Sequence, residues 1–235
     1  MERLTARLNI YSGAQLPDLQ NSYPWKFNEE LLFKKLCVIV NGDTWFSKNM
    51  DLKKKLCNEW KSADKDRRVK IATYYVRDWG GIKTNKPATI ERYVEILSNG
   101  KQPEFSGVAS WSKIAAIVNP EAHAIFDTRV AFSLNALQFL SEAGVSGWFP
   151  KMGGRNTLIE RVKPAIDERA KIQVWPKVQK EKAYLTYINL LKLVNASLES
   201  TPGLAPLEMV LFANAEALAH EVLRKLECPL TVSAG

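Results

Sequence analysis

A lysine and an aspartate stand out in this sequence because each comes just before an apolar stretch with helical spacing. They are Lys113 and Asp127, which lie 14 positions apart. A lysine amine is a nucleophile only without its proton, so a chemical role for Lys113 requires a pKa below its usual value of about 10.4. A carboxylate at Asp127 could stabilise positive charge that develops in a transition state. Each residue also has a simpler interpretation, since lysine is ordinarily a solvated charge and aspartate is a favoured helix N-cap.

The segment from residue 101 to residue 137 must position these two side chains. We expect an irregular stretch over 101–111, a compact apolar helix over 112–118, and a break at Asn119 and Pro120. A longer helix then opens near Asp127. The pKa of Lys113 would be lowered by desolvation or by the positive end of its own helix, and a position in the first turn of that helix is compatible with the second cause.

The rest of the chain has helical periodicity and no convincing two-residue alternation. Asn28 can cap a helix, Gly80 and Gly81 can end one, and Pro87 suits a first turn. The sequence therefore predicts an all-α fold, with one domain over 1–235 whose two lobes meet near residues 79–130. Predicted helices cover 28–40, a stretch from about 51, 66–79, 87–97, 182–198 and 207–226, and a loop covers 144–154.

The charge balance favours a polyanionic partner. Lys and Arg number 33 against 25 Asp and Glu, which gives a net charge of +8. Lysine runs such as 53–55 are interpreted as solvated faces. The cysteines are Cys37, Cys57 and Cys228, without a Cys-x-x-Cys pair, and histidine occurs only twice, so we expect neither a metal nor a cofactor.

The chain contains no membrane-spanning signal. No segment approaches the roughly 18 consecutive apolar residues that a bilayer requires, and the start Met1-Glu2-Arg3 is not followed by a long apolar stretch. We therefore expect a cytoplasmic protein that does not associate with membranes and that acts as a monomer.

The order of turn, lysine helix, break and aspartate helix resembles the helix-hairpin-helix DNA glycosylases. Ser106-Gly107-Val108 and the following small residues stand where that superfamily has its hairpin, and Phe126-Asp127-Thr128-Arg129-Val130 resembles its aspartate phrase. The chain departs from the pattern in three ways: it lacks the leading proline and second glycine of the hairpin, its turn is about one residue longer, and its lysine-to-aspartate interval is several residues shorter. The phrases SWSKIAAIVNP and AIFDTRVAFSLNAL look most like bacterial 8-oxoguanine glycosylase-like proteins, some of which act against phages with modified DNA bases.

The resemblance implies a hydrolase that binds double-stranded DNA, flips out a modified base and cleaves its N-glycosidic bond. Lys113 and Asp127 would be the catalytic pair, and Lys113 could also support nicking at the abasic site. The DNA-binding residues would be Gly107, Val108, Ala109, Ser110, Ser112, Arg129, Lys83 and Lys86. The base pocket would be formed by aromatic residues, namely Trp79, Trp111, Phe126 and Trp148.

Four functions remain open at this point. The first is excision of a disguised phage base, such as glucosylated hydroxymethylcytosine, and the second is 8-oxoguanine repair. The third is a DNA-binding module without catalysis, which the altered hairpin suggests, and the fourth is a helical interaction protein. A sugar-bearing base needs a wide polar cavity, whereas a tight aromatic slot would exclude it.

Overall fold

The protein is all-helical in a computed structural model, which describes residues 1–141 and 144–227. Within these residues there is no β-sheet, and a single isolated bridge joins Trp148 and Lys177. The predicted all-α class is therefore confirmed. No helix in the described ranges is long and apolar enough to cross a membrane. The α-helices are α1 (Glu2–Gln15), α2 (Leu19–Ser22), α3 (Glu29–Leu36), α4 (Trp45–Ser62), α5 (Lys65–Thr73), α6 (Pro87–Ser98), α7 (Val108–Val118), α8 (Thr128–Leu140), α9 (Thr157–Ile172), α10 (Ala183–Ser197), α11 (Leu204–Ala213) and α12 (Ala215–Glu227).

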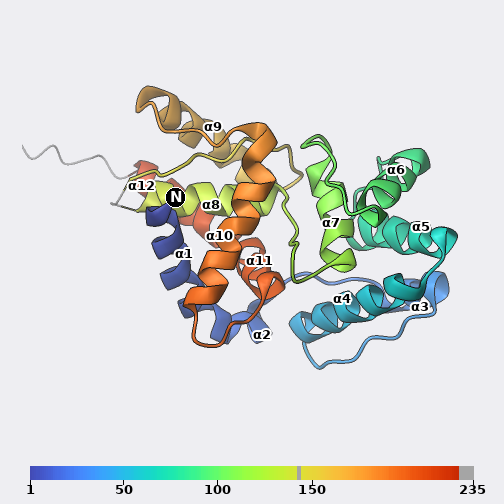
Figure 1. The fold of residues 1–235 in the computed structure, drawn as a ribbon. Coiled ribbons are helices and arrows are strands. Elements are labelled where there is room, and N and C mark those ends of the chain that lie inside the picture. Colours follow the sequence, from blue (N-terminus) through green and yellow to red (C-terminus); the bar gives the residue numbers. More distant parts are fainter. Residues whose placement is uncertain (142–143, 228–235) are drawn as a thin grey trace, which may run out of the picture.

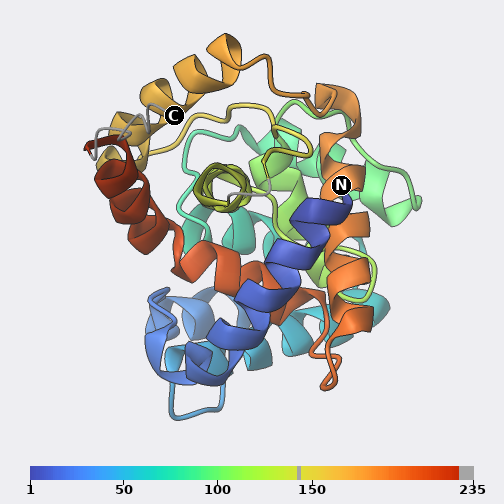
Figure 2. The same cartoon turned by 90° about the vertical axis from the view of Figure 1, so that its left-hand side faces the viewer.

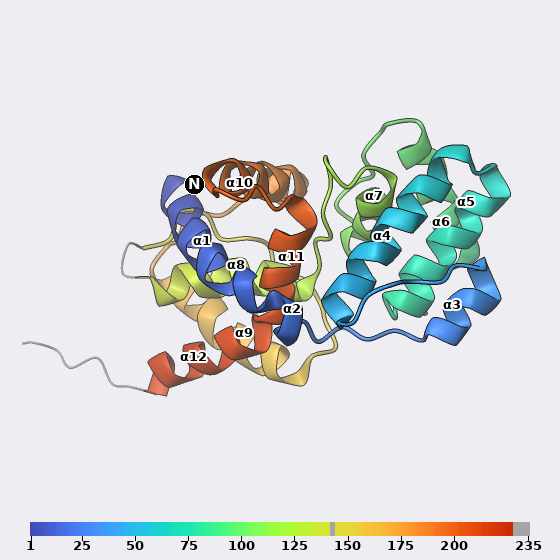
Figure 3. The same ribbon diagram turned by 90° about the horizontal axis from the view of Figure 1, so that it is seen from below.

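The helices pack in two groups that lie side by side in Figure 1. Helices α3 to α7 form one group, in which α4 and α6 both contact α7 and α5 contacts α6. Helices α1, α2 and α8 to α12 form the other. The chain therefore starts in the second group, crosses to the first, and returns (Figure 3).

Helix α8 is the centre of the second group. Figure 2 shows it end-on, surrounded by α1, α9, α10, α11 and α12. Eleven of its residues are buried, among them Val130, Leu134 and Leu137. A helix that is apolar on nearly all sides is stable only when neighbours cover every side, and this arrangement supplies them.

Two connections carry the chain between the groups. Residues 23–28 join α2 to α3, and residues 119–127 join α7 to α8. Helices α2 and α4 also contact one another across the boundary. Both connections contribute side chains to the site described below.

Several predicted helix boundaries were wrong by a turn or more. The helix predicted over 28–40 is capped by Asn28 as expected but ends at Leu36, because Cys37 adopts a left-handed conformation with φ of 57°. The helix expected from about 51 begins at Trp45, after a capping box formed by Thr44 and Ser47. Cys37 is exposed and Cys57 is buried, both as free thiols, whereas Cys228 lies outside the described residues.

Candidate active site

Lys113 lies on the buried face of α7, with only 4% of its surface exposed. Helix α7 begins at Val108 and not near Ser112, so Lys113 is in the second turn of the helix and the expected first-turn position is corrected. Its Nζ donates a hydrogen bond to the carbonyl of Ala109 at 2.9 Å. Burial lowers the pKa of Lys113 below its usual value, while the neighbouring carboxylates of Asp127 and Glu208 oppose that effect. Desolvation is the largest cause of the lowered pKa, and the nearby ammonium group of Lys53 adds to it.

Asp127 is the N-cap of α8 and also faces Lys113. Its Oδ1 accepts from the backbone amides of Arg129 at 3.0 Å and Val130 at 3.3 Å. Its other oxygen, Oδ2, lies 3.7 Å from Lys113 Nζ. The capping and chemical interpretations of this residue are therefore compatible, because one oxygen fixes the side chain while the other faces the amine.

The backbone before Asp127 is fastened at three successive residues. The hydroxyls of Tyr184 and Tyr187 on α10 donate to the carbonyls of Ala124 at 3.2 Å and Ile125 at 3.0 Å. The amide of Phe126 donates to Ser112 Oγ at 3.0 Å. Because Ser112 precedes Lys113 directly, this last bond couples the lysine helix to the aspartate turn.

A pocket with an empty volume of about 280 Å³ opens onto Lys113 and Asp127. It lies between the two groups of helices, where ligand sites commonly occur. Four aromatic side chains form much of its wall, and the ring centroids of Trp25 lie 5.8 Å from Trp79 and 5.3 Å from Phe212. Its full lining is Tyr23, Trp25, Trp79, Gly80, Lys113, Ile125, Asp127, Glu208 and Phe212.

Trp79 is held in the pocket wall by contacts on both sides. It ends a π-helical turn, Tyr74–Trp79, and stacks on Tyr75 with the ring centroids 4.2 Å apart. Its indole nitrogen donates to Asn49 Oδ1 at 2.8 Å, and Asn49 Nδ2 donates to the carbonyl of Trp25 at 2.9 Å. Asn49 thus positions two of the aromatic walls at once. The expectation that Trp79 borders the same cavity as Lys113 agrees with this placement.

A buried ion pair lies beneath the pocket. Lys53 Nζ on α4 is 2.9 Å from Glu208 Oε2 on α11, and the two side chains are 4% and 2% exposed. The interpretation of residues 53–55 as a solvated face was wrong for Lys53, because α4 turns this residue inward and Lys54 outward. Burial raises the pKa of Glu208, and the ammonium groups of Lys53 and Lys113 act against that rise.

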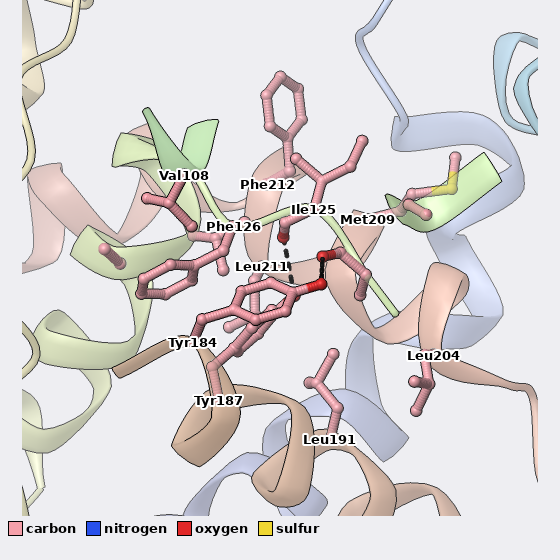
Figure 4. Packing of buried hydrophobic residues seen from close by; sticks show 14 of the residues in the cluster. Val108, Ile125, Phe126, Tyr184, Tyr187, Leu191, Leu204, Met209, Leu211 and Phe212 are labelled. Atoms are coloured by element: carbon pink, nitrogen blue, oxygen red, sulfur yellow. Dashed lines mark hydrogen bonds between the residues drawn. The ribbon is translucent and has the colours of Figure 1, made fainter. Parts of the chain in front are cut away.

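The other three aromatic residues proposed for the pocket lie elsewhere. Trp111 is fully buried, packs on Tyr184 and donates its indole N–H to the carbonyl of Glu104. Phe126 is also fully buried and stacks on Tyr187 with the ring centroids 4.9 Å apart (Figure 4). Trp148 lies against Trp175 and lines a different hollow, between α8 and α9. Aromatic residues are more often core than platform, and these three follow that rule.

The turn before α7 is only partly available to a ligand. Gly107 is exposed and adopts φ of 73°, and Ala109 is half-buried. Val108 and Ser110 are buried, and Ser110 Oγ accepts from Asn85 Nδ2 at 2.6 Å. Ser112 has no exposed surface. The side chains of Val108, Ser110 and Ser112 therefore lie inside the fold and do not face a ligand at the surface.

Several cations lie near this turn or near the mouth of the pocket. Lys83 and Lys86 are exposed in the loop before α6, whose Asn85 is tied to the α7 turn. Arg129 is only partly exposed, since it pairs with Glu216 at 2.8 Å and lies over the Phe212 ring. Sequence reasoning missed Arg155, whose guanidinium approaches Gly81 so closely that a Cβ there would lie 3.0 Å from Nη2.

The pocket also contains residues that no sequence signal pointed to. Tyr23 and Trp25 come from the first connection between the groups, and Phe212 comes from α11. All three are separated from Lys113 by dozens of residues, so only the folded chain brings them to it.

Comparison of the chain with protein-family models, with curated proteins and with solved structures returned no match.

Proposed function

We propose that this protein is a DNA glycosylase that excises a base held in the pocket beside Lys113 and Asp127. The observation that carries the proposal is the distance of 3.7 Å between Lys113 Nζ and Asp127 Oδ2 in an aromatic pocket. Cleavage of an N-glycosidic bond builds positive charge on the sugar, which a fixed carboxylate stabilises. Asp127 is such a carboxylate, since the α8 amides hold it in place.

Lys113 has the surroundings that a nucleophilic amine needs. Burial favours its neutral form. The nitrogen lone pair would attack C1′, while the base leaves with the electrons of the glycosidic bond and takes the proton that the amine loses. The nitrogen would then expel O4′, which takes a proton from solvent, and the enzyme would be left joined to the sugar as a protonated imine.

The pocket suits a flat ligand. A base inside a duplex is out of reach, so it must be flipped out and held by stacking and edge contacts. Trp25, Trp79 and Phe212 offer aromatic faces and edges for this purpose. The aromatic wall favours a planar base over a glucosylated one, whose sugar would have to lie outside the pocket. This supports repair of a small lesion such as 8-oxoguanine more than removal of a sugar-bearing phage base.

Double-stranded DNA fits the charge distribution. The net charge of +8 attracts phosphates, and Lys83, Lys86 and Arg155 are exposed. The exposed Gly107 turn lies beside the loop that carries the first two of these cations. We infer that a phosphate backbone follows this edge, with one chain of the protein on each DNA site.

The direct test is to incubate the protein with duplexes that each carry one candidate lesion and to add borohydride, which reduces an imine to a stable adduct. We expect a released base and a covalent complex with at least one lesion. The Lys113→Gln variant should abolish the adduct, and Lys70→Gln, a change of an exposed lysine on α5, should not. Asp127→Asn should lower base release by about 100-fold or more, as for loss of a main electrostatic group.

The matched control for Asp127→Asn is Asp64→Asn. Asp64 also caps a helix, accepting from the amide of Arg67 at 2.8 Å, but it does not line the pocket. Asparagine caps a helix about as well as aspartate, so both variants should fold normally. If no lesion gave a released base or an adduct, the proposed glycosylase activity would be refuted. Abasic sites without an adduct would keep the role of Asp127 and remove that of Lys113.

A DNA-binding module without catalysis is the second candidate. It is favoured by the α7 turn, in which the amides of Ser110 and Trp111 already donate to the Gly107 carbonyl and Lys113 Nζ is bonded to Ala109. Salt-dependent DNA binding that is unchanged in Lys113→Gln and Asp127→Asn, together with no base release, would select this function.

A further inference from the structure

Glu208 is a carboxylate in an unusual position, at the bottom of the pocket and almost entirely buried. It comes from α11, 155 residues after the lysine with which it pairs. A charge in such a place costs free energy unless it is paired, and Lys53 provides the pairing. The pair joins α4 of one helix group to α11 of the other.

The pairing with Lys53 leaves part of the carboxylate unused. Lys53 takes Oε2, and among the described residues Glu208 has no other hydrogen-bond donor. An ionised carboxylate offers about four acceptor sites on its two oxygens. The other carboxylate in the pocket is more fully engaged, because one oxygen of Asp127 caps α8 and the other faces Lys113. Glu208 is therefore the acceptor that remains for a ligand.

Lys53 holds this acceptor in place. It lies on α4 one helical turn after Asn49, which positions Trp25 and Trp79. The same face of α4 thus supports the aromatic wall and the carboxylate of the pocket. Lys53 does not line the pocket, so we regard it as a positioning residue.

We propose that Glu208 selects the substrate by accepting a hydrogen bond from an exocyclic amino group of the flipped base. This inference rests on the proposed glycosylase function. The substrate class is then amino-bearing bases, meaning cytosine, adenine or guanine derivatives. Uracil- and hypoxanthine-type bases lack that amino group, and most place a carbonyl oxygen there, which would face the carboxylate without a proton between them. Glutamate accepting from an amino group is an established mode of base recognition.

The test uses pairs of DNA substrates in which one member carries the amino group and the other carries a carbonyl oxygen or a hydrogen in its place. Suitable pairs are 5-hydroxymethylcytosine with 5-hydroxymethyluracil, adenine with hypoxanthine, and 8-oxoguanine with 8-oxohypoxanthine. For the pair that contains the substrate, the parent protein should release the amino member about tenfold faster or more. Glu208→Gln should reduce that ratio about tenfold, because the amide can present an N–H to a carbonyl. Glu30→Gln, which changes an exposed carboxylate on α3 that does not line the pocket, should leave the ratio unchanged.

Three controls separate the possible outcomes. Affinity for a duplex with an abasic-site analogue, which carries no base, should be the same in the parent and in Glu208→Gln. If Glu208→Gln does not fold, the double variant Lys53→Met/Glu208→Gln removes both charges and takes its place. Ligand-observed NMR with three nucleoside pairs, cytidine and uridine, adenosine and inosine, and guanosine and inosine, measures the preference of the full chain without requiring catalysis.

The inference would be overturned if the parent protein released both members of every pair equally. It would also be overturned if a folded Glu208 variant kept the parent's ratio. Neither result would contradict the proposed glycosylase function. Release of no base from any duplex would overturn the glycosylase. In that event, a nucleoside preference that disappears in the Glu208 variant would still support amino-group recognition. No nucleoside preference in the parent would reject it as well.

Discussion

The Lys113 side chain crosses directly over Gly80, so a Cβ on residue 80 would lie 2.7 Å from Lys113 Cε and 2.8 Å from Cδ. Gly80 has φ of −80°, which any residue can adopt, so the requirement for glycine here is one of space. The absence of a side chain at Gly80, at the end of the π-helical turn, thus leaves the space that the Lys113 side chain occupies.

Replacement of Gly80 by alanine should therefore displace Lys113. We expect Gly80→Ala to slow borohydride trapping of a preformed abasic site by about 100-fold, since a shift of about 1 Å in a reacting group has that effect. The crowding should also cost about 1–3 kcal/mol of stability. The matched control is Gly153→Ala, where nothing lies within 4 Å of an added Cβ. Trapping by Gly80→Ala at the parent's rate would contradict the role of Gly80.

Gly107 has both an unusual conformation and a close neighbour. Its φ is 73°, and an added Cβ would overlap the hydroxyl of Tyr93. Gly100 has a similar φ of 68° with open space around it, so Gly100→Ala measures the conformational cost alone, about 1–2 kcal/mol. Gly107→Ala should cost more stability than this and should distort the α7 turn.

The same pair of variants tests the interaction with DNA. If the turn at Gly107 binds phosphate, Gly107→Ala should flatten the dependence of log K on log salt by about one for each phosphate that the protein no longer neutralises. Gly100→Ala should leave that slope unchanged. Equal salt slopes for parent and Gly107→Ala, measured by fluorescence anisotropy, would place the DNA elsewhere on the surface.

The pairing of Lys113 with Asp127 was expected from the resemblance of their segment to the glycosylase pattern, since each residue alone has a simpler interpretation. In the structure the two side chains face one another, and the Ser112-to-Phe126 hydrogen bond couples the backbone segments that carry them. The start of α7 was misplaced because residues 106–110 are small and resemble a turn, although Gly107 is already the N-cap and the helix begins at Val108.

The remainder of the site could not be predicted because it depends on long-range packing. Tyr23 and Trp25 lie in a connection without periodicity, and Lys53 is part of a lysine run that looks solvated. Only the carboxylate of Glu208, 155 residues later, makes the burial of Lys53 tolerable. Helix α9 was not predicted from the sequence, because a proline such as Pro164 usually breaks a helix.

The buried Lys53–Glu208 pair should behave as a unit in unfolding experiments. Lys53→Met leaves an unpaired carboxylate in the core and should lower the free energy of unfolding by about 3–5 kcal/mol. The double variant Lys53→Met/Glu208→Leu removes both charges and should recover most of that loss. Urea unfolding monitored by circular dichroism, with equal m values, measures these differences. A double variant as unstable as the single one would mean that packing, and not the unpaired charge, dominates.

The chemistry of Lys113 should depend on pH in a direction that its surroundings determine. Burial lowers its pKa in the folded protein, so the neutral amine becomes populated below the pH at which a solvated lysine loses its proton. Trapping of a preformed abasic site should therefore rise with pH and level off above that lowered pKa. The same shift means that the folded state binds fewer protons than the unfolded state between the two pKa values, so the contribution of Lys113 to stability rises with pH across that interval.

The Asp127→Asn variant gives this pH dependence a second test. The Asp127 carboxylate raises the pKa of Lys113, so its neutralisation should move the midpoint of the trapping curve to lower pH. The preformed abasic site makes base excision unnecessary, so the variant can be compared directly with the parent. Asp64→Asn, at the α5 cap, should leave the midpoint where it is. A midpoint that moves to higher pH in Asp127→Asn, or does not move, would mean that the titrating group is not an amine held 3.7 Å from this carboxylate.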